Sequence, residues 1–585
     1  MIQIIDRDTS FCHKIKKRKC RKKGKALGKV TDLKEAIRSN VKSGMKLHLA
    51  GGIGGPSAAI CEIVRQFFGQ DPGFTLIQST LAGYGLVLLH CNLVKKAIFS
   101  AAIDISLSAR PSRVVQRAYK EKTIEFENWS LLSLQQRLMA GAMGLPFMPT
   151  RSLMGSDLAF DHKRSFLEIL DPFGSGKNIG IVKALVPDIS IVHGCASDAD
   201  GNVILSAPFG DDIWGCLAST NGVIATVERI VPADVIKRHA SLVRIPGYMV
   251  KAVSLVPFGL HPFSLANPGV EEVEAYETDA EFLRAMSDAS KRRETLDSWI
   301  EEWILECSDH EGYLKKLGKS KLELLKKEPA LAARSRLEVE ERNYAREMLL
   351  AAALGREIVS SVRTSGHKLI LTGAGSRIMP GVFLAYTLLK EDGYEVELMT
   401  GNGQLGFMPF AGMVNLSNEK TVRSSKMITD TVMAHGVFVA GKNSRCLAVI
   451  GSGQIDKFGN INSTLSSDGQ FLVGSGGSND AMNAREVIIV IDQSRDRFVD
   501  KLPYVTASGK NVSTVISTMG IFKKSVGEVE LQLVACFPQD GLNLKERIEE
   551  IRYRCGWPLR VASTVAEIDR PSPKEMEILR MFLFP

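Results

Sequence analysis

The 585-residue sequence has no run approaching the ~18 to 20 uninterrupted apolar residues that a membrane-spanning helix needs. Its first residues are basic, and no apolar segment of the kind found in secretory signals follows them. The ten cysteines form neither a CxxC pair nor an evenly spaced framework. Because this pattern fits a reducing compartment better than an oxidising one, we expect a cytoplasmic protein with no membrane partner.

The positive charge of the sequence is concentrated in one segment. The formal net charge is +9, and residues 14–25 (KIKKRKCRKKGK) hold nine basic side chains and no acidic one. A basic segment can bind the phosphates of a nucleic acid or an anionic membrane surface. The simpler interpretation, which we adopt, is a disordered and solvated tail over residues 1–28. The rest of the chain is close to neutral and gives no reason to expect a nucleic-acid partner.

Strand-like segments, glycine turns and helices alternate through the sequence. Residues 46–50 (KLHLA) alternate like a strand, residues 51–60 (GGIGGPSAAI) contain a glycine turn, and a helix follows. Such a unit opens an α/β fold, in which the glycines let a ligand approach the end of the strand. The dinucleotide-binding pattern is not met, because Ser57 stands where its third glycine belongs.

Residues 436–443 (GVFVAGKN) nearly fit the phosphate-binding loop pattern. The four residues between Gly436 and Gly441 are Val, Phe, Val and Ala, which favour a strand over a loop that encloses phosphate. Asn443 also replaces the Ser or Thr that binds the metal ion. We therefore reject a phosphate-binding loop here and expect no metal site.

The second half of the sequence repeats the plan of the first. Residues 368–385 (KLILTGAGSRIMPGVFLA) match residues 46–63 in having a strand, a glycine turn, a proline and a helix. Further on, the spacing Asp-x-x-Gly-Asn at 198–202 recurs at 456–460, each time after a strand-like run. Two matches in the same order indicate an internal duplication. We predict an α/β protein with two related halves built on largely parallel sheets.

The chain is too long for one ordinary core, so we expect more than one domain. Charge rises sharply through residues 315–342, which is typical of solvated helix faces that connect two halves. We divide the sequence into a basic tail (1–28), a first α/β domain (29–275), a helical connecting segment (276–345) and a second α/β domain (346–585).

The functional interpretation is built around residues 397–409 (ELMTGNGQLGFMP), where Gly401, Asn402 and Gly403 force a sharp turn. A tight glycine turn at a strand end lets the backbone press against a ligand. Together with GLPFMPTRSLMGSD at 144–157, GSGQIDKFGNINST at 451–464 and GSGGSND at 474–480, this turn resembles family I CoA-transferases, especially the two-subunit glutaconate type. The resemblance covers roughly residues 27–585. It implies an α-like and a β-like half fused in one chain.

The resemblance implies a coenzyme A thioester as substrate, a small carboxylic acid as second partner, no metal, and a site between the halves. In the family the glycine motif of the α half packs close to the acyl thioester, which implies this place for Gly51, Gly52, Gly54 and Gly55. Backbone N–H groups of the β-half glycine motif face the thioester, where they suit a developing oxyanion. This role is implied for Gly476 and Gly477. Assembly into a homo-oligomer is left open.

The sequence departs from the family at the nucleophile. The family's turn usually reads Ser-Glu-Asn-Gly, so Thr400 takes the serine position, Asn402 and Gly403 match, and Gly401 stands at the glutamate position. Ping-pong transfer needs that carboxylate to attack the acyl-CoA thioester and carry the CoA. Glycine cannot do this, and neither Thr400 nor Asn402 is a carboxylate. Glu397 lies four residues back in a strand-like segment. No catalytic residue is therefore assigned.

Three functions follow from the scaffold. The first is a CoA-transferase, in which Gly401→Glu is expected to restore or raise transfer. The second keeps the acyl-CoA but decarboxylates, hydrolyses or isomerises it, with His48, His193, Asp198 and Asp211 as candidate acids or bases beside their simpler roles in core and turns. The third is a pseudoenzyme that binds CoA thioesters without converting them.

Overall fold

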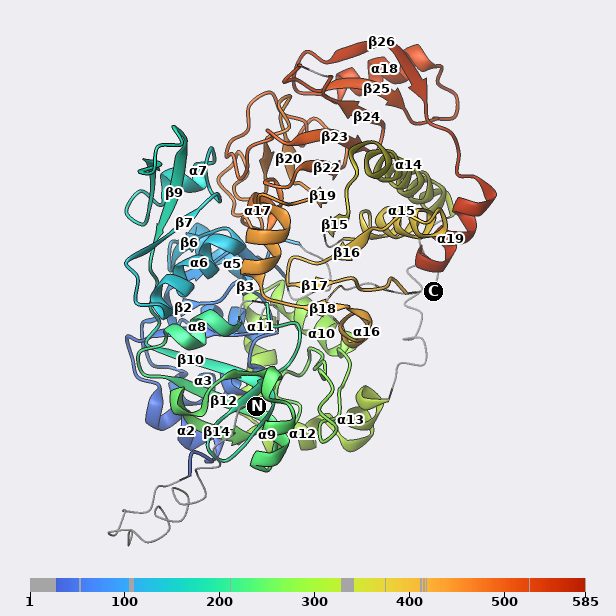
Figure 1. Cartoon of the computed structure of the whole chain (residues 1–585). Helices are drawn as coiled ribbons and strands as arrows, with labels where there is room; N and C mark the ends of the chain where they lie inside the picture. Colours follow the sequence, from blue (N-terminus) through green and yellow to red (C-terminus); the bar gives the residue numbers. More distant parts are fainter. Residues whose placement is uncertain are drawn as a thin grey trace, which may run out of the picture.

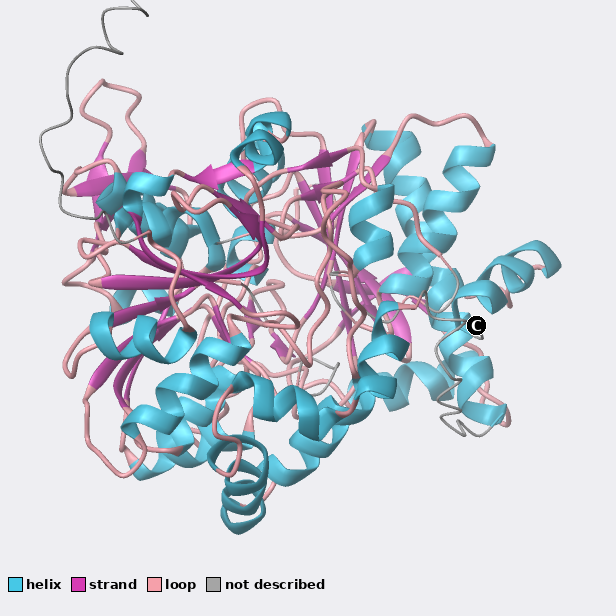
Figure 2. Cartoon of the chain, turned by 90° about the horizontal axis from the view of Figure 1, so that it is seen from below, coloured by secondary structure: helices cyan, strands magenta, loops and turns pink. Residues whose placement is uncertain are grey.

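The computed structural model of the chain describes residues 28–51, 54–104, 110–210, 212–327, 341–373, 375–410, 413, 416, 418–525 and 527–583. Two large twisted sheets, one in each half, organise these residues. Figure 1 shows the first half from blue to green and the second from gold to red. Helices cover the outer sides of the sheets, and loops fill the region where the two halves meet (Figure 2). The predicted α/β class with largely parallel sheets is confirmed.

The first sheet has nine strands and is parallel through most of its width. Its parallel strands run in the order β6-β4-β2-β1-β10-β12-β14, and β11 and β13 extend the sheet antiparallel beside β10. The strands are β1 (Lys46–Leu49), β2 (Phe74–Ile77), β4 (Val94–Phe99), β6 (Glu125–Asn128), β10 (Ile189–Ser197), β11 (Val203–Leu205), β12 (Val223–Ile230), β13 (Val243–Ile245) and β14 (Val250–Leu255). Every residue of β10 is buried, as expected for a strand covered on both faces.

The second sheet has ten strands in the order β18-β17-β16-β15-β19-β22-β23-β24-β25-β26. The run from β16 to β23 is parallel, β17, β18 and β24 pair antiparallel with their neighbours, and β26 runs parallel to β25. The strands are β15 (Leu369–Thr372), β16 (Glu397–Met399), β17 (Gln404–Leu405), β18 (Met427–Ile428), β19 (Cys446–Gly451), β22 (Glu486–Ile491), β23 (Val512–Ser517), β24 (Gly520–Lys523), β25 (Gln532–Cys536) and β26 (Arg560–Glu567).

The two sheets share one parallel core. The order β2-β1-β10-β12-β14 in the first corresponds to β16-β15-β19-β22-β23 in the second. The Asp-x-x-Gly-Asn turns, which follow β10 and β20 (Gln454–Ile455), also have the same hydrogen bonds. Asn202 donates its side-chain amide to Asp198 Oδ2 at 2.8 Å, and Asn460 donates to Asp456 Oδ2 at 2.8 Å. These shared details support the duplication that the sequence indicates.

Helices and three small sheets complete the fold. Helices of the first half are α2 (Leu33–Asn40), α3 (Ser57–Phe67), α4 (Tyr84–His90), α5 (Arg113–Glu121), α6 (Leu131–Ala142), α7 (Asp157–Asp161), α8 (Asp212–Ala218), α9 (Ala233–Arg238) and the short turns η1 (Ala240–Leu242) and η2 (Gly247–Met249). Along the chain, the segment that connects the two halves contains α10 (Ala280–Ser290), α11 (Arg293–Ile300), η3 (Glu301–Leu305), α12 (His310–Leu317) and α13 (Lys319–Lys326). The second half has α14 (Glu341–Ser365), α15 (Met379–Glu391), α16 (Glu419–Ser424), η4 (Val432–Val439), α17 (Ser478–Ala481), α18 (Leu544–Tyr553) and α19 (Pro573–Leu583). The small sheets are β7 (Phe147–Thr150), β9 (Asn178–Lys183) and β8 (Phe166–Leu170); β3 (Thr80–Leu81) with β5 (Ala101–Ala102); and β20 (Gln454–Ile455) with β21 (Ile461–Asn462).

One local prediction is wrong. Residues 436–439, expected to be a strand, belong to η4, a π-helix over Val432–Val439. Asp430 stabilises its first turn, because Oδ1 of that residue accepts a hydrogen bond from the Met433 N–H at 2.9 Å. Ala440 then donates to the His435 carbonyl five residues back at 3.0 Å, which is the wide hydrogen bond of a π-turn. Packing between the halves overrides the strand propensity of Val437 and Val439.

The residue limits assigned above to the domains and the connecting segment stay predictions, and residues 1–27 of the basic tail lie outside the described residues. Within the described part, no helix is long and apolar enough to cross a membrane. Nor do its His, Cys, Asp and Glu side chains form a group of three or more that could hold a metal ion.

Buried histidines make the stability of this fold dependent on pH. Burial lowers the pKa of His48 from 6.5 to about 4 and that of His310 from 6.5 to about 4. Below 6.5 the unfolded chain binds protons at these sites that the folded chain excludes, so the free energy of unfolding falls as pH falls toward 4. For each histidine, a pKa shift of this size lowers the free energy of unfolding by up to roughly 3 kcal/mol between neutral pH and pH 4.

We therefore expect the urea midpoint of wild type to fall between about pH 7.5 and about pH 4.5. His48 contacts Ser190 Oγ at 2.8 Å, and His48→Asn keeps a polar partner for that hydroxyl but cannot titrate. The midpoint of the variant should fall less steeply with pH than that of wild type, each measured against its own value at neutral pH. If the midpoints of wild type and His48→Asn fell equally with pH, the lowered pKa of His48 would not contribute to the pH dependence of stability.

Candidate active site between the two halves

The predicted turn is a closed hairpin between β16 and β17. The Thr400 N–H donates to the Gln404 carbonyl at 3.0 Å, and the Gly403 N–H donates to the Thr400 carbonyl at 3.1 Å. The Thr400 hydroxyl donates to Gln404 Oε1 at 3.0 Å and so holds the hairpin together. Gly403 has a φ of +92°, and a Cβ there would lie 2.2 Å from the Thr429 carbonyl oxygen. Only glycine fits this position, and Thr400 is committed to the turn.

Gly401, the position of the missing glutamate, faces an imidazole. A Cβ at Gly401 would lie 2.9 Å from Nε2 of His435 in η4. A Cβ at Gly477, in the second-half glycine motif, would lie 3.3 Å from Cε1 and Nε2 of the same ring. The fold thus brings both Gly401 and Gly477 next to the Nε2–Cε1 edge of one side chain. Gly401→Glu, expected above to restore transfer, therefore also requires His435 to move.

His435 is buried and polar without a partner. Its exposed fraction is 2%, and neither ring nitrogen has a hydrogen-bond partner in the described part of the chain. Burial lowers the pKa of His435 below its usual value, and the nearby charge of Asp480 partly opposes this shift. The imidazole is therefore neutral near pH 7, with one nitrogen able to donate and the other able to accept.

The glycine motif at 474–477 docks the second half onto the first. The Gly476 N–H donates to the Ser100 carbonyl at 2.8 Å, and the Gly476 carbonyl accepts from the Leu131 N–H at 2.9 Å. The Ser475 N–H donates to Asn128 Oδ1 at 3.1 Å. The Gly476 N–H is therefore not open to a ligand, which corrects the donor role expected for it. Gly477 keeps its place beside His435.

Asp480 continues this contact between the halves. Its carboxylate accepts from the Leu132 N–H at 2.8 Å and from the Ser152 hydroxyl at 2.6 Å, both in the first half. Burial raises the pKa of the Asp480 carboxyl, while His435 and these donors lower it. The Asp480 carboxyl on α17 is thus held by α6 and by the segment that contains Ser152, and it lies near the imidazole.

The first-half glycine turn closes at the end of β1. The Gly55 N–H donates to the Gly51 carbonyl at 2.8 Å, and a Cβ at Gly54 would lie 3.2 Å from Phe263. A Cβ at Gly55 would approach Gln78 Nε2 at 3.4 Å. Gly52 lies outside the described residues. The turn leads into α3 and places Gly55 against the buried amide of Gln78.

Five buried side chains around these turns have a polar atom with no hydrogen-bond partner within the described part of the chain, namely Gln78, Gln135, Gln404, Thr431 and His435. Further atoms of this kind are spread over the rest of the molecule. Buried polar atoms in native proteins are normally hydrogen-bonded, so a gathering of unpartnered ones indicates a place for a polar ligand or for ordered water.

Hydrogen bonds connect Gln135 of the first half with the glycine motif beside His435. Gln135 Nε2 donates to the Ser79 hydroxyl at 2.9 Å, and the Ser100 N–H donates to the Ser79 carbonyl at 2.9 Å. Ser100 in turn accepts from Gly476, the neighbour of Gly477. Gln135 is therefore linked through Ser79 and Ser100 to Gly476, whose neighbour Gly477 lies beside the ring of His435.

Three of the candidate acids and bases named from the sequence belong to other networks. His48 contacts Ser190 Oγ at 2.8 Å, and His193 contacts Thr226 Oγ1 at 2.9 Å and Glu228 Oε1 at 2.8 Å. Asp198 accepts from the Asn202 N–H at 2.9 Å and shapes its turn. Asp211 lies outside the described residues. These contacts favour the core and turn roles of all three.

Glu397 is engaged by two lysines. It accepts from Lys426 Nζ at 2.7 Å and Lys390 Nζ at 3.4 Å. It therefore does not replace the missing glutamate.

A pocket of about 520 Å³ opens between the halves. Arg244 of the first half and Arg423 of the second lie in its wall, together with Ile428. Ile428 belongs to β18 and pairs with Gln404 of the glycine hairpin. The volume lies within the range of about 300 to 1,000 Å³ that is usual for small-molecule sites. This pocket borders the hairpin and has positive side chains from both halves.

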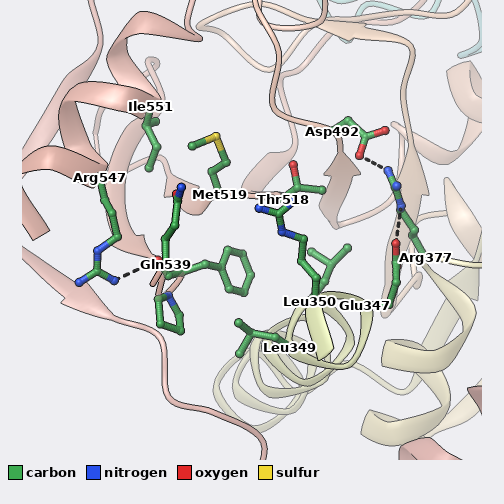
Figure 3. Close-up of a pocket in the computed structure, with 13 residues that line it drawn as sticks. Glu347, Leu349, Leu350, Arg377, Asp492, Thr518, Met519, Gln539, Arg547 and Ile551 are labelled. Carbon is green, nitrogen blue, oxygen red and sulfur yellow. Dashed lines mark hydrogen bonds and ion pairs between the residues drawn. The ribbon is translucent and has the colours of Figure 1, made fainter. Parts of the chain in front are cut away.

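A second pocket of about 190 Å³ lies at the carboxyl ends of β15, β22 and β23 (Figure 3). Arg377 on one side is paired with Asp492 and Glu347, and Arg547 on the other donates to the Phe537 carbonyl at 3.0 Å. None of the residues predicted from the sequence lines either pocket. The pocket between the halves is the better candidate for a substrate, because it borders the glycine hairpin through Ile428.

Comparison with known proteins agrees with this architecture. Residues 30–255 match the family model described as coenzyme A transferase. One of the two subunits of glutaconate CoA-transferase from Acidaminococcus fermentans is 30% identical over 323 residues, which are 52% of this chain and 97% of that polypeptide. The chain belongs to the coenzyme A transferase family. The predicted resemblance is confirmed.

The family relationship extends to both halves. The other glutaconate CoA-transferase polypeptide of the same organism is 27% identical over 164 residues, 25% of this chain and 59% of that polypeptide. The acyl-CoA transferase YdiF of Escherichia coli O157:H7 has the same fold, with a TM-score of 0.64 over 97% of this chain and 98% of that chain, at 16% identity. This member of the coenzyme A transferase family is therefore similar to both glutaconate polypeptides, and one chain carries the whole fold.

Sequence reasoning missed His435, Gln78 and Gln135. His435 directly precedes residues 436–443, and reading those as a strand hid that it lies on a helix facing the glycine hairpin. The available signal was a lone histidine in an apolar run, TVMAHGVFVA, in a family member without its glutamate.

The docking of the glycine motif can be tested with a matched pair of substitutions. Gly474 and Gly469 have φ values of +89° and +76°, so alanine costs roughly 1 to 2 kcal/mol of backbone strain at either. At Gly474 the new Cβ would also lie 2.7 Å from Asn128 Nδ2 and 2.8 Å from the Ser100 carbonyl, whereas at Gly469 it meets open space. We expect Gly474→Ala to lower the thermal unfolding midpoint clearly more than Gly469→Ala. Equal shifts would show that this contact does not hold the halves together.

Proposed function

We propose that this coenzyme A transferase family member acts on an acyl-CoA thioester held between its two halves, without forming a glutamyl-CoA intermediate. Family membership and the shared fold support the substrate class. Gly401 supports the change of mechanism, because a covalent CoA carrier needs a carboxylate at that position. Coenzyme A enters this proposal as part of the substrate, and a small carboxylic acid is the expected product or partner.

The gathering of unpartnered buried polar atoms is the observation that carries the proposal. Gln78, Gln135, Gln404 and His435 leave donors and acceptors unused around three glycine turns. An acyl thioester presents a carbonyl oxygen, and a small acyl-CoA adds further polar groups, so such a ligand can satisfy these atoms. Each satisfied group recovers roughly 1 to 3 kcal/mol of desolvation cost. Binding of the thioester would thus offset the desolvation cost of these unpartnered polar groups in the free protein.

In this proposal the backbone around the glycines surrounds the thioester. Gly51, Gly54 and Gly55 form the first-half wall, where the absence of side chains lets the acyl group approach the end of β1. Gly403 keeps the hairpin tight enough for Gly401 to face the ligand. Gly477 lies beside the same ring of His435. The two arginines of the pocket between the halves, Arg244 and Arg423, suit the negative groups of the substrate.

The experiment is a panel of acyl-CoA and dicarboxylyl-CoA esters with and without carboxylate acceptors. We expect wild type to consume at least one ester while the intact protein mass, measured during turnover, shows no added CoA. Isotope-labelled acceptor acids should not accumulate as CoA esters. A CoA adduct on the protein, or acceptor-dependent exchange, would contradict the proposed mechanism and return the chain to ordinary CoA transfer. Tight CoA-ester binding without any product would instead identify a pseudoenzyme.

A further inference from the structure

The space next to Gly401 is filled by a residue from a different segment. A Cβ at Gly401 would lie 2.9 Å from His435 Nε2, which is closer than real Cβ contacts come. Any side chain at position 401 would therefore start inside the volume that the imidazole occupies. Glycine at 401 leaves the space that the histidine at 435 fills. The loss of the glutamate and the presence of the imidazole are therefore linked.

The ring is held in place by packing rather than by hydrogen bonds. It projects from η4, which packs against α6 of the first half and α17 of the second. Gly477 Cβ would meet the ring at 3.3 Å, and a Cβ at Gly436 would lie 3.7 Å from the Leu132 side chain. A buried imidazole with both nitrogens unpartnered among the described residues has its full hydrogen-bonding capacity free for a ligand.

We propose that His435 is the catalytic base of this site and that the chain is an acyl-CoA hydrolase, in which His435 activates the water that attacks the thioester. The inference rests on the proposed function and names its reaction. The missing carboxylate removes the covalent route, while an imidazole at the same place supplies a proton acceptor within reach of the same carbonyl.

The step balances without any further reactant. The water oxygen forms a bond to the thioester carbonyl carbon while one ring nitrogen of His435 takes a water proton. The tetrahedral intermediate collapses as the C–S bond breaks, and the CoA thiolate leaves with the electron pair. The imidazolium returns its proton to that thiolate. The products are the carboxylic acid and CoA thiol, and His435 is neutral again.

The electrostatics of the site suit this role. Burial lowers the pKa of His435, so its accepting lone pair is available at neutral pH. Asp480 on α17 is the titratable group whose charge acts on the ring, and it stabilises the imidazolium that forms during turnover. The carboxylate is fixed by Leu132 and Ser152, so it remains near the ring without forming a hydrogen bond to it.

The first test compares wild type with His435→Gln, which keeps a polar group but cannot take up a proton. We expect kcat for acyl-CoA hydrolysis to fall by about 10²- to 10⁴-fold while the Kd for a non-hydrolysable CoA thioether stays within about threefold. With wild type in ¹⁸O-labelled water, one labelled oxygen should enter the acid product. The wild-type rate should fall as pH drops through an apparent pKa below 6.5, and this limb should be absent in His435→Gln. His90→Gln, at the end of α4 where the ring contacts Asp297 at 2.7 Å, should match wild type.

The possible failures are distinguishable. If wild type neither binds nor consumes any ester of the panel, both the proposed function and the inference fail. If it consumes an ester but His435→Gln keeps kcat within about threefold, or if the acid carries no label, His435 is not the base although the proposed function stands. Binding without consumption also overturns the base role.

A second pair of variants tests the shared space directly. Gly401→Glu forces a side chain against the ring, so it should reduce hydrolysis by at least about 100-fold and show no CoA adduct. Gly401→Glu/His435→Ala frees the room that the glutamate needs, and it should form a CoA adduct visible by intact mass and transfer CoA to carboxylates. A single Gly401→Glu variant with wild-type hydrolysis would show that the imidazole does not occupy this space.

Discussion

Insertion of one segment of the second half into the first half fixes the position of every other part of the site. Phe471 is 2% exposed and lies within the first half's core, with ring centroids 5.6 Å from Phe99 and 5.6 Å from Tyr119. Nine residues on, Asp480 accepts hydrogen bonds from Leu132 and Ser152. Between these anchors the glycine motif at 474–477 runs against the strand ends of the first sheet. An apolar contact thus supplies most of the attraction, while the hydrogen bonds fix the register.

This docking explains why a buried site can be built from two halves. Each half contributes a turn at the carboxyl end of a parallel sheet, where ligands of open α/β sheets usually bind. Glycines recur at these turns because φ values such as +92° at Gly403, and neighbours within 3 Å of a would-be Cβ, exclude other residues. His435 lies between two such turns. A neutral imidazole is one of the few side chains that fits there with modest desolvation cost, since a charged group would need a partner.

The sequence allowed the α/β class, the duplication and the family to be predicted, because these depend on periodicity and on long motifs. The strand at 46–50 was found almost residue for residue, since β1 ends at Leu49. The helix at Val432–Val439 was not, because Val437 and Val439 favour a strand locally, whereas the helix packs against α6, α17 and β19, which lie far from it in the sequence or follow it. His435 was missed for the same reason. The use of the Gly476 N–H in docking could not be predicted either, because a hydrogen bond to Ser100 joins residues 376 positions apart.

The central claim is that an acyl-CoA carbonyl lies between Gly401, Gly477 and His435 in place of a covalent glutamyl thioester. The most direct test is a crystal structure of the protein with an acyl-CoA analogue whose thioester sulfur is replaced by methylene. The account predicts the ketone carbonyl within hydrogen-bond distance of a ring nitrogen or of a water held by it, about 2.6 to 3.2 Å. An analogue bound in the pocket of Figure 3, or bound between the halves with its carbonyl turned away from His435, would contradict it.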